Sequence, residues 1–264
     1  MSINPTHYEV IASVISHELN DDEVWFIGLA TGLETIFLLS RIPLVGMSLA
    51  QHMHAPNSIM TVQGFIVNPV VSETPTAMES EFATELYDWR CECQNSKSLP
   101  TPDVGFGSSA QIDKYGNSNI VAIGDYHKPK VRLIGPINQP AHFSMFGREY
   151  VVFDHDKRNF VDKVDFVSGV GYVDGPGGRE KLGLPGGGPR LILTDKAIFD
   201  FHPETKLARL KSIHAGVSLD EVIENTGYTH DWVPHQVPVT PQPTDEEVRL
   251  IREVIDPEAK LLPR

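Results

Sequence analysis

The segment His127–Arg132, whose sequence is HKPKVR, concentrates positive charge. If this segment is an extended strand, Lys128, Lys130 and Arg132 point to one face of it, because side chains alternate along a strand. Three cations on one face would bind phosphate groups through charge-assisted hydrogen bonds. The alternative is a solvated edge strand, on which lysines prevent pairing with other chains. The sequence leaves both hypotheses open.

A second candidate binding element is the sequence GLATG, which begins at Gly28 and ends at Gly32. It lies between an apolar run typical of a strand and a stretch with helical periodicity. A turn from strand to helix presents backbone amides at a sheet edge, where α/β proteins bind ligands. A simple tight turn is the alternative, which the sequence favours. The glycines at Gly175, Gly177 and Gly178 match a dinucleotide fingerprint poorly, because no helical pattern follows at the required distance.

Other kinds of site are not indicated. The eleven histidines show no metal-ligand spacing, and His52 and His54 would lie on different faces of a helix. We therefore expect no metal. The sequence contains no G-x-S-x-G nucleophile elbow. Cys91 and Cys93 lack the C-x-x-C spacing of a redox site, so we expect two reduced thiols.

Composition excludes further classes of protein. The net charge of −13 and the pI of about 5.2 leave no basic footprint for nucleic acid. Hydrophobic residues make up 41% and charged residues 22%, as in ordinary globular proteins. No apolar run reaches the roughly eighteen residues of a membrane span. The first residues do not resemble a secretory signal, so a cytoplasmic location is expected.

Helical patterns and short apolar runs typical of buried strands are mixed along the chain, which indicates the α/β class. We expect helices at residues 6–19, 33–53 (broken at Pro43), 78–88, 219–225 and 244–254. We expect strands at residues 24–27, 59–62, 104–106, 120–123, 130–134, 150–153, 163–167, 190–194 and 197–201. Thr6 and Thr244 each precede a glutamate by three residues, as in a capping box.

The remaining segments have loop chemistry. Residues 113–119 contain the Asp, Gly and Asn residues typical of a hairpin turn. Residues 175–189 form a loop rich in glycine and proline. Residues 70–102 are expected to form a peripheral excursion.

Several short strings, spread in order over most of the chain, together carry a resemblance to a known family. They are AQID and YGN within 110–117, GDYH at 124–127, DGPGGRE at 174–180, LGLPG at 182–186, ENTG at 224–227, and IRE and IDP within 251–257. Together they resemble the β subunit of glutaconate coenzyme A-transferase, a family I CoA-transferase.

This resemblance implies a fold, a partner and a reaction. The fold would be a single α/β domain over residues 1–264, with an open, mostly parallel sheet and helices on both faces. The partner would be a homologous α subunit, usually in an α2β2 assembly. Coenzyme A would enter as part of an acyl-CoA substrate, with no permanently bound cofactor. In the family, a glutamate of the β subunit attacks the thioester and then carries coenzyme A as a glutamyl thioester.

The resemblance places Gln63 at the position of that catalytic glutamate. Ala55-Pro56 leads without a gap through the strand at 59–62 to Gln63. A glutamine amide donates and accepts hydrogen bonds, but it is not a nucleophile. It can hold a carbonyl group or a water molecule, and it cannot form the glutamyl thioester.

A second departure from the family concerns its Gly-x-Gly-Gly turn, whose amides lie near the thioester. Here the corresponding residues are Gly135-Pro-Ile-Asn-Gln-Pro140. The two prolines have no N–H to donate, and the close backbone approach that glycine permits is lost.

Three hypotheses follow. The first is an acyl-CoA hydrolase or lyase, similar to divergent family members that open a carbon ring or decarboxylate an acyl-CoA. In it, Gln63, Asn138 and His142 polarise the substrate or orient water, and the α subunit contributes further catalytic groups. The second is a genuine transferase with a displaced nucleophile, for which Glu34 and Glu73 are candidates. The third is a non-catalytic subunit that binds coenzyme A or stabilises an active α subunit.

The resemblance also indicates what the candidate binding residues would bind. Lys128, Lys130 and Arg132 would bind the phosphates of coenzyme A, and the Gly28 and Gly32 turn would contact the acyl-CoA. The very apolar stretch at residues 36–49 is expected to contact the α subunit, because an exposed apolar patch marks an interface.

Overall fold

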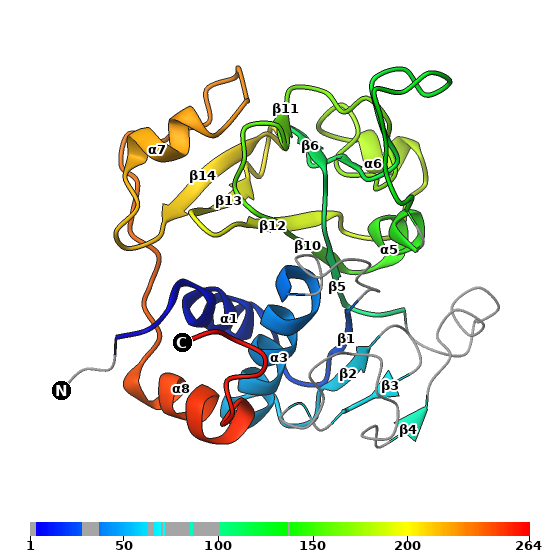
Figure 1. The fold of residues 1–264 in the computed structure, drawn as a ribbon. Coiled ribbons are helices and arrows are strands. Elements are labelled where there is room, and N and C mark those ends of the chain that lie inside the picture. Colours follow the sequence, from blue (N-terminus) through cyan, green and yellow to red (C-terminus); the bar gives the residue numbers. More distant parts are fainter. Residues whose placement is uncertain are drawn as a thin grey trace. The chain divides into compact units, whose positions relative to one another are not determined.

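The structure is a computed structural model that describes residues 4–27, 37–62, 66–69, 71, 85–86, 101–136 and 138–264 (Figure 1). They form two compact units. The first comprises Met1–Phe106 and Pro241–Arg264, and the second comprises Gly107–Thr240. The single domain over residues 1–264 stays a prediction, and most of the expected excursion at residues 70–102 lies outside the described residues.

The apolar residues 24–27 form an inner strand of the sheet in the first unit. Its described strands follow one another in the order β5 (Val104–Gly107), β1 (Val24–Ile27), β2 (Ile59–Val62), β3 (Ile66–Val67) and β4 (Glu85–Leu86). β1 is parallel to both of its neighbours, and the outer pairings are antiparallel. Trp25, Phe26 and Ile27 are fully buried, as expected of a strand between parallel neighbours.

Helices from both ends of the chain belong to this unit. They are α1 (His7–Glu18), the π-helix η1 (Phe37–Arg41), α3 (Ile42–Met53), α8 (Asp245–Leu250) and the π-helix η3 (Ile251–Ile255). Both predicted capping boxes form. Pro43 lies in the first turn of α3, where no N–H is needed, so it begins a helix and does not break one.

The apolar stretch of α3 is buried within the first unit. Ile42, Val45, Met47 and Leu49 are fully buried, and α3 packs against α1. A Cβ atom built on Gly46 would lie 2.8 Å from the carbonyl oxygen of Ala12, so glycine permits this close packing. The expectation that residues 36–49 contact a partner is therefore wrong for residues 42–49, because those side chains fill the chain's own core.

Hydrogen bonds also connect α8 to α1, which are far apart in the sequence. The Glu247 carboxylate accepts from Ser13 Oγ at 3.0 Å and lies 2.8 Å from His17 Nε2. Arg252 of η3 pairs with the buried carboxylate of Glu9 at 2.7 Å. These contacts place the last helices beside the first one (Figure 1).

The second unit contains one larger sheet and two small ones. The larger one has the strands β10 (Arg148–Val152), β12 (Pro189–Leu193), β13 (Ala197–Phe201) and β14 (Ala208–Ile213). The small ones pair β11 (Phe160–Val161) with β6 (Gln111–Asp113) and β7 (Ser118–Asn119), and β8 (Ala122–Ile123) with β9 (Val131–Arg132). β10 and β12 are parallel, whereas β12, β13 and β14 are antiparallel.

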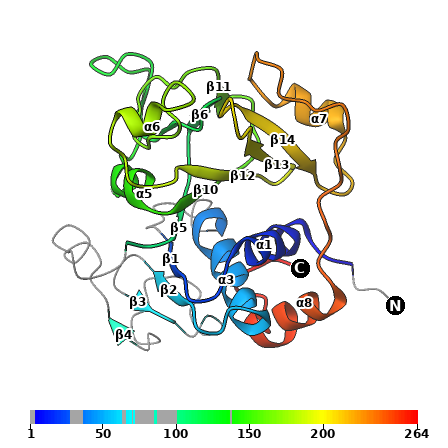
Figure 2. The same cartoon turned by 180° about the vertical axis from the view of Figure 1, so that it is seen from behind.

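Short helices and an aromatic core complete this unit. The helices are α5 (Gln139–Met145), α6 (Gly178–Lys181) and α7 (Leu219–Glu224), of which α7 lies beside β13 and β14 in both views (Figure 1, Figure 2). Phe160, Phe199, Tyr228 and Trp232 pack together in the core.

The α/β class and the open sheet are confirmed, and so is the hairpin turn at residues 113–119, since β6 and β7 are antiparallel neighbours. Three expectations are wrong. β4 lies inside the helix expected at 78–88. The strand expected at 163–167 is found as β11 at 160–161, and β9 covers only two residues of the strand expected at 130–134. No helix among the described residues is long and apolar enough to cross a membrane.

Candidate functional site

Gln63 follows the carboxyl end of β2 in the chain. β1 and β2 run in parallel and end together, with Ile27 paired with Val62. The next residues in the sequence are Gly28 and Gln63, and both lie outside the described residues, as does Gly32. Because open α/β sheets bind ligands at the carboxyl ends of their strands, the described strands favour this edge as the site. The roles of the three residues stay predictions.

Three backbone amides in the first turn of α5 donate to carbonyl groups at or just before the start of this helix. The amide of Gln139 donates to the carbonyl group of Pro136 at 2.7 Å. The amides of Ala141 and His142 donate to the carbonyl group of Asn138 at 3.0 and 3.2 Å. The Asn138 side chain is half-buried and does not cap the helix. These amides are therefore engaged in local structure and not presented to a ligand.

His142 and Glu149 form a buried pair. Nδ1 of His142 lies 2.9 Å from Oε1 of Glu149, and their side chains are only 6% and 0% exposed. Oε2 of Glu149 has no hydrogen-bond partner among the described residues. Burial raises the pKa of the Glu149 carboxyl, and the charges of His142 and Arg179 oppose that rise. A carboxylate that orients a histidine is a common arrangement in catalytic sites.

Gln139, by contrast, has a structural role. Its Nε2 donates to the carbonyl group of Ser108 at 2.8 Å and to Ser118 Oγ at 3.0 Å. Its Oε1 accepts from Ser168 Oγ at 2.6 Å. A buried amide with all these partners fixes α5 against its neighbouring segments.

The three predicted cations do not share one strand. The amide of Lys128 donates to Asp125 Oδ1 at 3.0 Å, so Lys128 lies in a turn. Arg132 lies in β9, where Nη2 donates to the carbonyl group of Tyr126 at 2.8 Å and the guanidinium lies 5.0 Å from the centre of the Tyr126 ring. Of the three residues only Arg132 lies in a strand, since β9 begins at Val131, so the alternation argument does not apply to Lys128 and Lys130. Phosphate binding by these residues stays a prediction. All three residues are exposed.

Arg179 organises the glycine-rich loop through main-chain contacts. Its guanidinium donates to five carbonyl groups at 2.8 to 3.2 Å, those of Phe143, Ser144, Val170, Gly171 and Gly186. The string DGPGGRE therefore has a structural role here. The positive charge of Arg179 also acts electrostatically on the buried Glu149 carboxylate.

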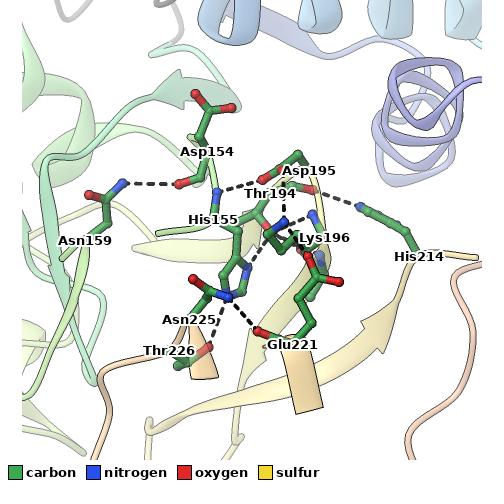
Figure 3. A network of polar contacts seen from close by, with 11 residues as sticks. Asp154, His155, Asn159, Thr194, Asp195, Lys196, His214, Glu221, Asn225 and Thr226 are labelled. Carbon is green, nitrogen blue, oxygen red and sulfur yellow. Dashed lines mark hydrogen bonds and ion pairs between the residues drawn. The ribbon is translucent and has the colours of Figure 1, made fainter. Parts of the chain in front are cut away.

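A second buried histidine, His155, lies in a polar network that connects the end of β10 to β12, β13 and α7 (Figure 3). Its ring nitrogens lie 2.9 Å from Thr194 Oγ1 and 3.0 Å from Thr226 Oγ1. Its amide donates to Asp195, and Lys196 pairs with Glu221 of α7 at 2.7 Å. Both ring nitrogens are engaged, so we interpret this network as structural.

The part of the chain that the structure describes contains no group of three His, Cys, Asp or Glu residues that could hold a metal ion.

Comparison with known proteins decides the family. The family model of coenzyme A transferases matches residues 39–225. The chain belongs to the coenzyme A transferase family. It is 33% identical to the B-subunit of glutaconate CoA-transferase from Acidaminococcus fermentans, over 96% of this chain and 94% of that protein. The crystal structure of the A. fermentans glutaconate enzyme superposes with a TM-score of 0.80 at 30% identity, with both chains fully covered.

Proteins described as a hydrolase subunit and a decarboxylase are also similar to this chain. The cholesterol ring-cleaving hydrolase IpdB subunit of Rhodococcus jostii is 36% identical over 56% of this chain and 57% of its own length. The structure of IpdAB from the same organism has a TM-score of 0.74 at 26% identity, with 97% of each chain covered. The decarboxylase AibA/AibB shares the fold, with a TM-score of 0.75 at 20% identity and 96% of each chain covered.

The sequence indicates His142 as a candidate site residue, but it does not indicate Glu149, which pairs with it, or Arg179, which acts on Glu149. Glu149 begins a strand whose sequence, REYVV, gives no sign that the carboxylate is buried. In the sequence, Arg179 stands out only as part of the string DGPGGRE. The available signal was the presence of a lone arginine within a glycine-rich loop, because such a loop has many carbonyl groups to satisfy.

Proposed function

We propose that this chain is the β subunit of a heteromeric cytoplasmic acyl-CoA enzyme, assembled as α2β2, that hydrolyses or cleaves its substrate without transferring coenzyme A. The observation that carries the proposal is glutamine at the position of the family's catalytic glutamate, directly after the carboxyl end of β2. Without a carboxylate there, the glutamyl thioester cannot form.

The first turn of α5 also departs from the pattern expected of a transferase. A transferase has to stabilise negative charge on the thioester oxygen, which pre-oriented amides commonly do. Here the amides of Gln139, Ala141 and His142 donate to carbonyl groups of the same segment, and the two prolines have none. In the proposed enzyme, Gln63, Asn138 and His142 polarise the acyl-CoA or orient water, and the α subunit completes the site.

The alternative function is a transferase with a displaced nucleophile. Its support is the 33% identity to the glutaconate enzyme subunit over 96% of this chain. Glu34 and Glu73 are its candidate nucleophiles, and both lie outside the described residues.

We expect no covalent adduct on this chain when its complex with the α subunit is treated with glutaconyl-CoA and then with hydroxylamine or borohydride. Intact-mass and peptide analysis should show Gln63 unmodified. Gln63→Glu should recover little transferase activity, because the absent oxyanion donors are commonly worth ~3 kcal/mol each. The glutaconate enzyme of A. fermentans is the positive control. A coenzyme A adduct on Glu34 or Glu73 would establish the displaced-nucleophile transferase.

The exposed cations are proposed to bind the phosphates of coenzyme A. Replacing Lys128, Lys130 and Arg132 with alanine should weaken binding of acetyl-CoA at least about tenfold, since hydrogen bonds to charged groups contribute ~1.5–3 kcal/mol each, and should reduce its salt dependence. Calorimetry at two salt concentrations measures both effects. A Lys128→Ala, Lys130→Ala double variant avoids the contact between Arg132 and Tyr126.

The matched control replaces three other exposed cations of the same unit, Lys157, Arg158 and Lys181. It should leave acetyl-CoA binding unchanged. If the wild-type protein, the triple variant and the double variant bind acetyl-CoA equally, Lys128 and Lys130 are solvated surface charges with no part in coenzyme A binding.

A further inference from the structure

The hairpin formed by β8, β9 and the loop between them presents an aromatic ring at the surface of the second unit. The ring belongs to Tyr126, which is 47% exposed. The Phe166 ring stacks on it with ring centroids 5.2 Å apart and 21° between the ring planes. The Arg132 guanidinium lies 5.0 Å from the centre of the Tyr126 ring. This aromatic and cationic surface has no role in the function proposed above beyond the charge of Arg132.

Hydrogen bonds hold the loop of the hairpin in one conformation. Oδ1 of Asp125 accepts from the amides of His127 and Lys128 at 2.8 and 3.0 Å. Nη2 of Arg132 donates to the carbonyl group of Tyr126 at 2.8 Å. The guanidinium therefore stays beside the tyrosine ring without a ligand. A surface that is ordered in advance loses less conformational entropy when it binds a ligand.

Further contacts anchor the hairpin on β6. Oδ2 of Asp165 accepts from the amide of Gly124 and from Nε2 of Gln111, both at 2.9 Å. The amide of Lys130 donates to the carbonyl group of Ile123 at 2.8 Å and so closes the loop. The exposed ring is therefore part of a fixed surface.

An exposed ring with cations beside it is typical of surfaces that bind nucleotides. Bases stack on tyrosine rings and on guanidinium planes, and neighbouring cations bind the phosphates. Lys128, Lys130 and Arg132 belong to the same hairpin as Tyr126, and all are exposed. A protein partner suits this surface less well, because lysine is depleted in protein interfaces.

We propose that Tyr126, together with the guanidinium of Arg132, is the surface on which the adenine ring of an acyl-CoA stacks, and that Lys128 and Lys130 bind the phosphates beside it. This inference rests on the proposed function, which makes an acyl-CoA the substrate. Every coenzyme A thioester carries the same purine and phosphates. This surface therefore recognises the nucleotide half of the substrate and does not select the acyl group.

The first test measures binding of acetyl-CoA and of adenosine bisphosphate, the nucleotide half of coenzyme A, by calorimetry of the complex with the α subunit. Tyr126→Leu removes the ring and keeps an apolar side chain. It should weaken binding of both ligands by the same factor, about five- to a hundredfold, as expected when one base loses its stacking partner. Tyr126→Phe keeps the ring and should bind both ligands within about twofold of the wild type.

The matched control is Tyr115→Leu, which removes another tyrosine ring of the same unit that lies near a cation. The Lys114 ammonium is 5.8 Å from the centre of that ring. This variant should bind both ligands like the wild type. Equal binding of acetyl-CoA by the wild type and Tyr126→Leu would overturn the inference, and so would a wild-type complex that binds acetyl-CoA but not adenosine bisphosphate.

The second test needs no variant. An analogue of acetyl-CoA with an azide on its adenine ring, photolysed in the wild-type complex, should label the peptide that contains Tyr126. Excess coenzyme A should prevent this labelling. Labelling confined to other peptides of the complex would place the adenine elsewhere and overturn the inference.

Contact with the α subunit is the competing role, because Val131, Ile134 and Val167 on and near the hairpin are between 45% and 70% exposed. If Tyr126→Leu weakens assembly with the α subunit, but the assembled complex binds acetyl-CoA like the wild type, the surface is a subunit contact and the inference is wrong. A wild-type complex that binds neither ligand would count against the proposed function as well. The search for a covalent adduct judges that function separately.

Discussion

Replacing Arg179 with lysine is expected to destabilise the second unit by roughly 4 kcal/mol or more, a loss typical of a broken buried network. The guanidinium donates to the carbonyl groups of residues 143, 144, 170, 171 and 186. An ammonium group has three donors at one point and lacks the planar fork that spans these segments. Each carbonyl group left buried without a donor costs about 1–3 kcal/mol.

Urea unfolding of the wild type and Arg179→Lys measures this loss. The matched control is Arg158→Lys, whose guanidinium is 86% exposed and pairs with Asp156 on the surface. Exposed ion pairs contribute at most about 1 kcal/mol, so this variant should unfold like the wild type. A loss below about 1 kcal/mol in Arg179→Lys would mean that water or other donors replace the guanidinium.

Stability is expected to fall by ~3 kcal/mol through His155 alone as the pH is lowered from about 6.5 to about 4. Desolvation by burial lowers the pKa of His155 from 6.5 to about 4. The unfolded chain therefore binds a proton before the folded chain does. The stabilising contribution is fully present above the unfolded pKa and is lost as the pH falls toward the folded value.

The hydrogen bonds explain why the neutral ring fits. Thr226 donates its hydroxyl proton to the carbonyl group of Val222 at 2.7 Å, so it accepts from Nε2–H of His155. The hydroxyl group of Thr194, whose oxygen lies 2.9 Å from Nδ1, donates its proton to the carbonyl group of Ala197 at 2.7 Å. Its oxygen can therefore accept from a protonated Nδ1, so the main penalty of protonation is the buried charge itself.

The measurement is urea unfolding at several pH values between 7.5 and 4. The stability of His155→Gln should depend less on pH than that of the wild type, because the amide keeps hydrogen-bonding groups but does not titrate. His127→Gln, at an exposed position, is the matched control and should retain the wild-type slope. Equal slopes in all three proteins would show that folding does not lower the pKa of His155.

Elements with a purely local signal could be predicted from the sequence. The capping boxes at Thr6 and Thr244 and the strand at 197–201 form as expected. β6 and β7 were missed because their polar side chains are buried. Gln111 and Asn119 bond each other at 2.7 Å, and a sequence does not indicate which polar residues will find such partners.

The candidate site was predictable to a similar extent. The run from Ala55-Pro56 through the strand at 59–62 predicts the position of Gln63, and the segment from Gly135 to Pro140 contains Asn138 and lies just before His142. The roles of these three residues stay predictions. The burial of Glu149 depends on how β10 and α5 pack, which no local pattern encodes. The prediction that Lys128 lies in a strand was wrong for a related reason. The side chain of Asp125 accepts hydrogen bonds from the backbone amides of His127 and Lys128, and this bends the segment into a turn.

The contacts between α8 and α1 affect how the protein folds during synthesis. The second unit is one continuous stretch, Gly107–Thr240, whereas the first unit needs residues from both sides of it. At translation rates of about 5–20 residues per second, α1 waits roughly 10–50 s for its partners in α8 and η3. During this interval Glu9 and Ser13 lack Arg252 and Glu247, and the apolar faces of α1 and α3 lack the helices that follow. The second unit is complete in sequence before α8 is made, whereas the first unit cannot form its contacts to α8 and η3 until residues 245–255 have been synthesised.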